Sequence, residues 1–306
     1  GVSAREHRIY RALAGKKELL VRLYGMISST DPELPTILSE GPITDENDLY
    51  SARSVKVYTD GALGSRGAAL LQPYSDRPDH TGLLLTSKQT LRDILEDAVL
   101  SGFQVAIHAI GDKGNQLALD EIEWSYSSVG GKELRHRVEH AQVVDLEDIP
   151  RFKLLNVIPS MQPTHATSDM NMAEDRIGAE RLKGAYAWRT FIDQGSRLAS
   201  GSDFPIELAN PFYGIHAAVT RQNRQNLPIK GWISEQSISI TEAIRSFTID
   251  AAWAAHQETT LGSLEVGKWA DFIIIDRDIF NEPQESIWKT EVLQTWIAGA
   301  VVYQKS

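Results

Sequence analysis

The sequence predicts an α/β fold, because short strand-like runs alternate with helix-like runs over most of its 306 residues. The strand signals are apolar stretches rich in β-branched residues, and the helix signals are apolar residues spaced three and four apart. This alternation implies parallel strands that are covered by helices. A closed (β/α)8 barrel and an open doubly wound sheet both satisfy the pattern.

The main body of the fold is expected to contain six strands with helices between them. The clearest helix covers 87–102, where Ser87 is a suitable N-cap residue, apolar residues follow at helical spacing, and Gly102 ends the helix. The expected strands are 19–27, 54–61, 103–112, 134–142, 156–163 and 197–205, and further helices are expected within 1–20 and over 114–126, 145–153, 185–195 and 241–257.

The residue composition of the sequence changes near residue 259. The segments 260–278 and 292–304 are rich in β-forming residues and contain turn glycines. We therefore expect residues 1–258 to form the α/β body and residues 259–306 to supply the strands of a small β subdomain.

Composition narrows the class of partner. Lys and Arg number 31 against 41 Asp and Glu, the formal charge is −10, and no basic run is present, so neither nucleic acid nor a membrane surface is an expected partner. A small molecule is expected instead. There is no cysteine, so any metal must be held by His, Asp, Glu or an oxygen derived from Lys. No stretch of 18 apolar residues suggests a membrane span. The sequence leaves the location unknown, with the cytoplasm slightly favoured.

Ionisable residues lie at the ends of four expected strands: Lys56, His108, His140 and Asp203. In a barrel, catalytic groups come from the carboxyl ends of several strands and point at one mouth. Two imidazoles and a carboxylate suit a divalent ion such as zinc, while the lysine needs a separate reason. Three of them also have a simpler interpretation: an edge strand with a solvated face for Lys56, a core histidine for His108, and a turn aspartate for Asp203. His136 and His140 would form a two-histidine metal site if 134–142 were a helix instead of a strand.

Six motifs in this order resemble the metal-dependent amidohydrolase superfamily. Within it, they are most similar to the amidohydrolase-3 branch, which includes N-substituted formamide deformylase and proteins described as exoenzyme regulators. The motifs are VKVYTDGALGSRGAAL (55–70), VAIHAIGDKGNQLALDEIE (105–123), RHRVEHAQ (135–142), SMQPTHATSDM (160–170), LASGSDFPIE (198–207) and GSLEVGKWADFIIID (262–276).

The resemblance implies a TIM-type (β/α)8 barrel flanked by a β-sandwich. It assigns Lys56 as the fourth-strand lysine, which in many members carries a carbamate that bridges two metals, and His108 and His140 as the ligands of the fifth and sixth strands. Asp203 corresponds to the eighth-strand aspartate, which binds metal and shuttles a proton. His136 matches no ligand. Arg66 and His165 occupy loop positions that face the substrate in relatives, and their simpler interpretations are a surface charge and an ordinary loop histidine.

One departure from the family pattern concerns the first barrel strand. Members carry a His-x-His pair there, and none occurs in these 306 residues. Because VRLYGMI (21–27) resembles the third strand, we expect the chain to hold strands three to eight and to be the C-terminal portion of a longer protein. Open strand edges would favour association, so an inactive barrel fragment that pairs with itself or with the missing N-terminal segment is an alternative.

The expected reaction is hydrolysis of an amide or related C–N bond in a small-molecule substrate. One or two divalent ions, with zinc the expected metal, would activate water, and Asp203 would pass its proton to the departing amine. A metal-dependent isomerase on the same scaffold is a further alternative, since fold does not determine function.

Overall fold

A computed structural model describes residues 1–306, which form two compact units. Unit 1 comprises Gly1–Pro159 and Asp175–Ala185, and unit 2 comprises Ser160–Glu174 and Tyr186–Ser306. The small β subdomain expected from residue 259 onward lies inside unit 2. None of the helices combines the length and apolar character that crossing a membrane requires.

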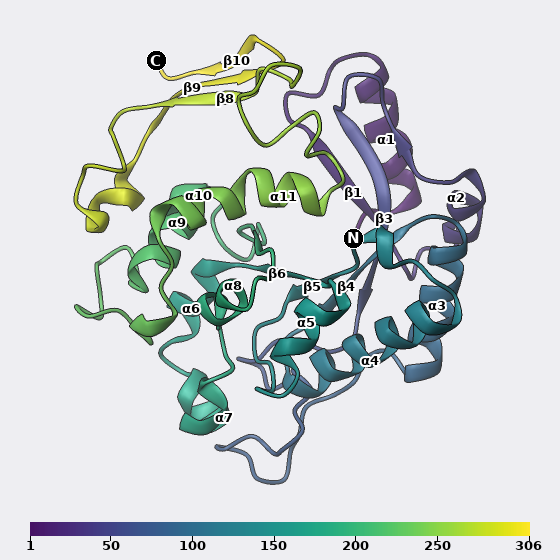
Figure 1. Cartoon of the computed structure of the whole chain (residues 1–306), viewed down its shortest axis with the longest axis vertical. Coiled ribbons are helices and arrows are strands. Elements are labelled where there is room, and N and C mark those ends of the chain that lie inside the picture. The colour runs from purple at the N-terminus through teal and green to yellow at the C-terminus, as the bar shows by residue number, and fades with distance from the viewer. The chain divides into compact units, whose positions relative to one another are not determined.

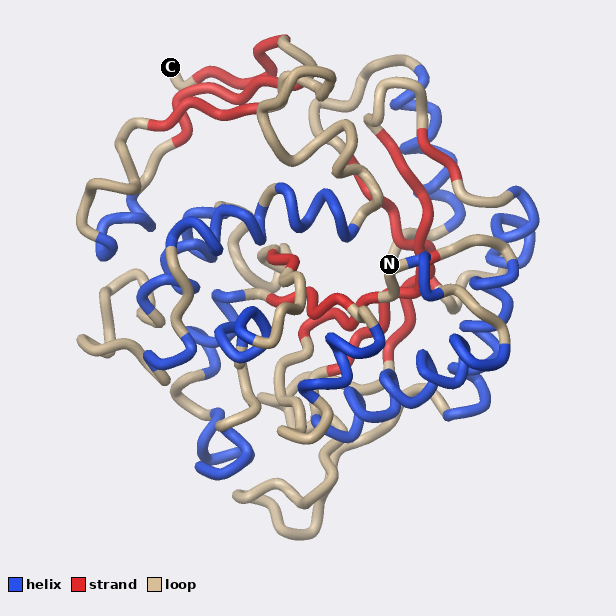
Figure 2. Tube along the Cα trace, in the orientation of Figure 1, coloured by secondary structure: helices blue, strands red, loops and turns tan.

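Unit 1 is built on a parallel sheet. Strands β1 (Leu23–Ser28), β3 (Tyr50–Tyr58), β4 (Gln104–Ala109) and β5 (Arg137–His140) pair in that order, all parallel. Figure 2 shows these strands in red among the blue helices. The pairing confirms four of the expected strands and their parallel direction. A two-residue strand, β2 (Ile43–Thr44), pairs antiparallel with β3 and is too short to leave a periodic signal in the sequence.

Helices α3 (Lys88–Leu100) and α4 (Asp112–Ser128) pack side by side against this sheet (Figure 1). The Ser87 side chain accepts a hydrogen bond from the Thr90 backbone N–H, which confirms the expected N-cap. The apolar stripe expected on α3 is buried at Leu91, Leu95 and Ala98. The other helices in or mostly in unit 1 are α1 (Ala4–Gly15), α2 (Leu34–Glu40), α5 (Ile149–Leu155), α7 (Ala173–Leu182) and the 3-10 turn η1 (Lys132–Leu134).

Strand alternation separates the core from the polar side chains. Val55 and Val57 of β3 and Val105 and Ile107 of β4 are at most 1% exposed. The intervening Lys56 therefore belongs to the other face of the sheet, as the alternation predicts.

Unit 2 contains the end of a fifth parallel strand and the sixth. Strand β6 (Ile158–Met161) begins in unit 1, where the Ile158 N–H donates to the His136 carbonyl, and its last two residues pair in parallel with β7 (Ala199–Ser200). The helices of this unit are α6 (Pro163–Asp169), α8 (Trp188–Asp193), α9 (Pro211–Thr220), α10 (Ile240–Phe247), α11 (Ile249–Ala254) and the 3-10 turns η2 (Ser234–Gln236) and η3 (Gln284–Lys289).

The single helix expected over 241–257 is wrong. Thr248 has φ −127° and ψ −99°, which breaks the segment into α10 and α11. Ser239 caps α10 through a reciprocal capping box with Glu242, so the first of the two helices has its own start signal.

The C-terminal strands form a separate antiparallel sheet, as expected. Its order is β10 (Ala300–Gln304), β9 (Val292–Ile297) and β8 (Phe272–Ile275), and it is drawn in yellow-green to yellow in Figure 1. The rings of Phe272 and Trp296 stack across β8 and β9, with 5.2 Å between centroids. The fold is thus α/β, with six parallel strands and a small antiparallel sheet.

Candidate metal and catalytic site

Three of the predicted site residues of unit 1 lie at the carboxyl ends of neighbouring strands. Tyr58 links two of them: the Lys56 Nζ lies 4.9 Å from the Tyr58 ring centroid, and the Tyr58 ring lies 5.2 Å from that of His108. The His108 ring in turn meets the His140 ring edge to face, at 4.5 Å between centroids. Lys56 and His140 are 8% and 7% exposed, so the group is largely shielded from water.

The backbone at His140 explains why its ring reaches His108. In the β4–β5 register, His108 is paired with Glu139 and Ala109 with His140, so regular alternation would put Glu139 on the face of His108. His140 instead has φ +79°, in the left-handed region, followed by Ala141 at φ +42°. This break in the alternation lets the His140 ring contact His108.

His136 lies in a different environment from His140. Its Nδ1 accepts a hydrogen bond from the Val105 backbone N–H at 2.9 Å, and its ring stacks on Tyr126 of α4. The segment is a strand, so the alternative of a helical pair formed by His136 and His140 is wrong.

A buried ion pair next to His108 has no counterpart in the sequence analysis. Arg137 Nε lies 2.6 Å from Glu139 Oε1, and both side chains are about nine-tenths buried. The pattern RHRVEH contains the signal, because Arg137 and Glu139 alternate with the histidines and must occupy the opposite face of a regular strand.

Asp60 is a second buried carboxylate close to the predicted ligands. Its Oδ1 lies 3.5 Å from His108 Nε2, and the residue is 1% exposed. Burial raises the pKa of Asp60 to about 6, although hydrogen bonds from the backbone N–H groups of Ile110, Gly111 and Ala69 act to lower it.

Two predicted site residues of unit 2 approach each other. His165 lies on α6, just after β6, and Asp203 follows β7 by three residues. The His165 Nε2 is 3.7 Å from the Asp203 Oδ2, with exposed side-chain fractions of 12% and 39%. The β6–β7 pairing holds them, since the Gly201 N–H extends it by donating to the Met161 carbonyl. The loop position predicted for His165 is wrong, because Pro163 begins a helix there.

Arg66, the other predicted substrate contact, is engaged within its own loop. Its guanidinium donates from Nε and Nη2 to the two carboxylate oxygens of Asp76, at 3.1 and 2.8 Å. Arg176 of α7 also pairs with Asp76. In this structure Arg66 therefore helps to fix the loop.

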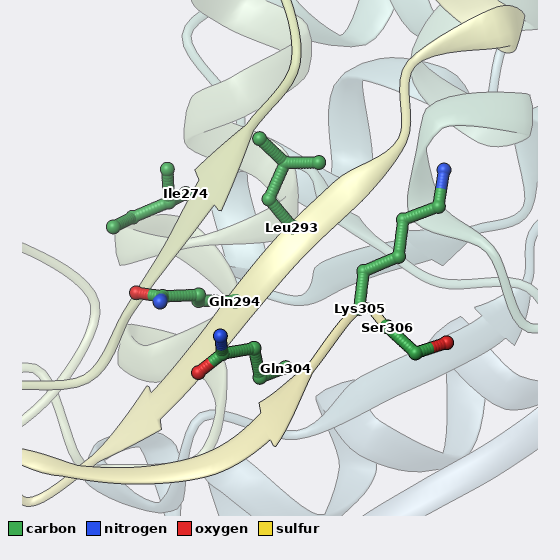
Figure 3. Close-up of a pocket in the computed structure, with 6 residues that line it drawn as sticks. All are labelled: Ile274, Leu293, Gln294, Gln304, Lys305 and Ser306. Atoms are coloured by element: carbon green, nitrogen blue, oxygen red, sulfur yellow. The ribbon is translucent and has the colours of Figure 1, made fainter.

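A hollow on the small sheet of unit 2 carries little chemistry (Figure 3). Its one charged side chain is that of Lys305, which pairs with Glu291. The residues that line it are Ile274, Leu293, Gln294, Gln304, Lys305 and Ser306.

Comparison with known proteins identifies the family. Residues 2–303 match the amidohydrolase family. The chain belongs to this family. Among curated proteins, this amidohydrolase chain is similar to Protein LONG AFTER FAR-RED 3 of Arabidopsis thaliana, at 35% identity over 96% of the chain and 50% of the relative. It is also similar to the putative amidohydrolase YtcJ of Bacillus subtilis, at 35% identity over 83% of the chain and 47% of the relative.

The resemblance read from the motifs is confirmed. A further relative is N-substituted formamide deformylase of Arthrobacter pascens, at 26% identity over 85% of the chain and 47% of that protein. The amidohydrolase chain thus spans about half the length of the curated relatives it matches.

Solved structures agree with the barrel class of the fold. An uncharacterized metal-dependent hydrolase from Pyrococcus horikoshii matches with a TM-score of 0.80 and 31% identity, over 93% of this chain and 56% of its own. A second, from Pyrococcus furiosus, matches with a TM-score of 0.76 and 32% identity, over 88% and 53%. The parallel strands and helices of this amidohydrolase chain are therefore part of a TIM-type barrel, confirming the expected fold.

Proposed function

We propose that the protein is a metal-dependent hydrolase that cleaves an amide or related C–N bond in a small molecule. Family membership supports hydrolase chemistry, and both similar structures from Pyrococcus are described as metal-dependent hydrolases. The C–N bond is favoured by the relative from Arthrobacter pascens, whose name describes the deformylation of N-substituted formamides.

We further propose that Lys56, His108, His140 and Asp203 bind one or two divalent ions, with zinc the expected metal. Imidazole nitrogen and carboxylate oxygen are the ligand atoms that zinc accepts in a protein without cysteine. Lys56 would contribute through a carbamate oxygen formed on its Nζ with CO2. The position of Lys56 supports this role, since it is 8% exposed and lies near the carboxyl end of β3, beside the strand that carries His108.

The observation that carries the metal proposal is the distance between an imidazole nitrogen, that of His165, and a carboxylate oxygen of Asp203. Two ligand atoms about 2.1 Å from a tetrahedral zinc ion lie roughly 3.4 Å apart. The separation of His165 Nε2 and Asp203 Oδ2, 3.7 Å, is close to this value. We therefore include His165 as a further candidate ligand, beside its predicted role in substrate binding.

The residues have separable tasks in the proposed reaction. A bound divalent ion would acidify a water molecule and polarise the carbonyl of the substrate. Asp203 takes the proton as water attacks and returns it to the departing amine, acting first as base and then as acid. The Asp203 side chain is 39% exposed, so it is accessible to water and to a substrate. Arg66 or His165 would steady a substrate oxygen.

The test is the hydrolysis of N-substituted formamides and other acyl amines by the zinc-loaded full gene product, with products identified by mass spectrometry. We expect hydrolysate, and Asp203→Asn should lower kcat by about 10²- to 10⁴-fold because the proton shuttle is lost. Asp193→Asn on α8 is the matched control, since its carboxylate is exposed and pairs only with Arg189. Wild-type kcat in Asp203→Asn would contradict the assignment, and an isomer as product would favour the isomerase alternative.

A further inference from the structure

Asp60 is a buried carboxylate that the proposed ligand set leaves without a role. It follows β3 by two residues and is 1% exposed. Its oxygens accept hydrogen bonds from three backbone N–H groups, those of Ala69, Ile110 and Gly111, at 2.9, 2.9 and 2.8 Å. The donors belong to two separate segments, the loop 61–86 and the turn between β4 and α4. Asp60 therefore joins that loop to the turn that follows His108.

Two glycines, Gly111 and Gly114, leave room for the contacts around the Asp60 carboxylate. A Cβ on Gly114, in the first turn of α4, would lie 2.7 Å from Asp60 Oδ2. A Cβ on Gly111 would lie 2.0 Å from the Ala69 carbonyl oxygen. The N-terminus of α4, the positive end of the helix dipole, can approach Asp60 and the Ala69 carbonyl only because both positions lack a side chain.

Asp60 also faces the ring of His108. Its Oδ1 lies 3.5 Å from His108 Nε2. The neighbouring Thr59 fixes the same residue through the backbone, since its N–H and its hydroxyl both donate to the His108 carbonyl oxygen, at 2.9 and 2.6 Å. A carboxylate beside one ring nitrogen of a metal-binding histidine sets the tautomer and the ring orientation.

We propose that Asp60 is a positioning residue for His108. Its carboxylate favours the tautomer with the proton on Nε2, which leaves the Nδ1 lone pair for the metal, and its backbone contacts hold the loop 61–86 against the turn behind the ring. This inference rests on the proposed function in so far as His108 is a metal ligand.

The test reads the tautomer of His108 directly, by NMR of 15N-histidine-labelled, metal-free protein with His108 assigned through His108→Gln. We expect the Nε2-protonated form in the wild type and loss of that preference in Asp60→Asn. Zinc titration should show a weakening of about 10- to 100-fold in Asp60→Asn. Asp112→Asn is the matched control: Asp112 accepts from the Leu71 N–H and so also contacts the loop, but its carboxylate bonds to the Leu71 and Lys113 N–H groups and not to His108.

Three results would each overturn the proposal. The first is a wild-type His108 that carries its proton on Nδ1, a result that needs no variant. The second is an unchanged tautomer and zinc affinity in Asp60→Asn, and the third is an equal loss of zinc affinity in Asp112→Asn. If His108→Gln leaves zinc affinity unchanged, the ligand assignment of the proposed function fails instead, and the tautomer in metal-free protein still decides the role of Asp60.

Discussion

The rings of His108 and His140 meet edge to face at 4.5 Å although their Cα positions are not paired across β4 and β5. Regular alternation would direct them to opposite faces of the sheet, and the left-handed backbone of His140 at φ +79° brings them together. Such strain persists where the surrounding structure enforces it, and it is typical of functional sites. The strained residue here is a predicted metal ligand.

Substitution of His140 should separate the backbone requirement from the chemistry. Asn tolerates the left-handed region, whereas Val, which is β-branched, does not. We expect the free energy of unfolding of His140→Asn to be close to that of the wild type, and that of His140→Val to be lower by about a further 1–2 kcal/mol. Urea denaturation measures this difference, and zinc titration should show weakened binding in both variants. Equal stabilities of the two variants would mean that the backbone strain has no energetic consequence.

Gly111 should tolerate no side chain, for steric reasons alone. Its φ of −78° is ordinary, but an added Cβ would lie 2.0 Å from the Ala69 carbonyl oxygen. We expect Gly111→Ala to destabilise the fold by about 1–3 kcal/mol, the usual effect of overpacking. Gly15→Ala at the end of α1 is the control, since no atom lies within 4 Å of its added Cβ. Equal melting temperatures in the two variants would count against the tight approach of α4.

His7 should make stability depend on pH. It is buried, its Nδ1 lies 2.8 Å from the Tyr50 hydroxyl, and burial lowers its pKa below the ordinary 6.5. A lowered pKa in the folded state means that its contribution to stability is complete above pH 6.5 and is lost as the pH falls through the folded value. The free energy of unfolding of the wild type should therefore fall relative to His7→Gln between about pH 8 and about pH 5. A constant difference across that range would show that His7 does not titrate as stated.

Asp76 should control the order of the loop 61–86, since it pairs with both Arg66 and Arg176. We expect Asp76→Asn to speed hydrogen exchange of that loop while α4 stays protected. Asp79→Asn is the control, because Asp79 is exposed and pairs with Arg77 alone. If the loop exchanges at the same rate in both variants, the arginine pairs do not hold it.

The sequence allowed the parallel strands, the main helices and the small sheet to be predicted because each has a clear period and clear end signals. The break at Thr248 cannot be predicted in this way, since apolar helical spacing continues across it and only the backbone angles reveal it. Alternation placed Lys56 and His108 on the polar face correctly. It could not place His140, whose position depends on a left-handed backbone, nor reveal the role of Asp60, whose partners lie 9, 50 and 51 residues away in the chain.

The central claim is that side chains from separate strand ends hold a divalent ion. The most direct measurement is anomalous diffraction at the zinc edge from crystals of the zinc-loaded full gene product. We expect a peak about 2.0–2.2 Å from an imidazole nitrogen of His108 or His140 and from a carboxylate oxygen of Asp203. A zinc peak bound elsewhere, or none beside these side chains, would contradict the claim.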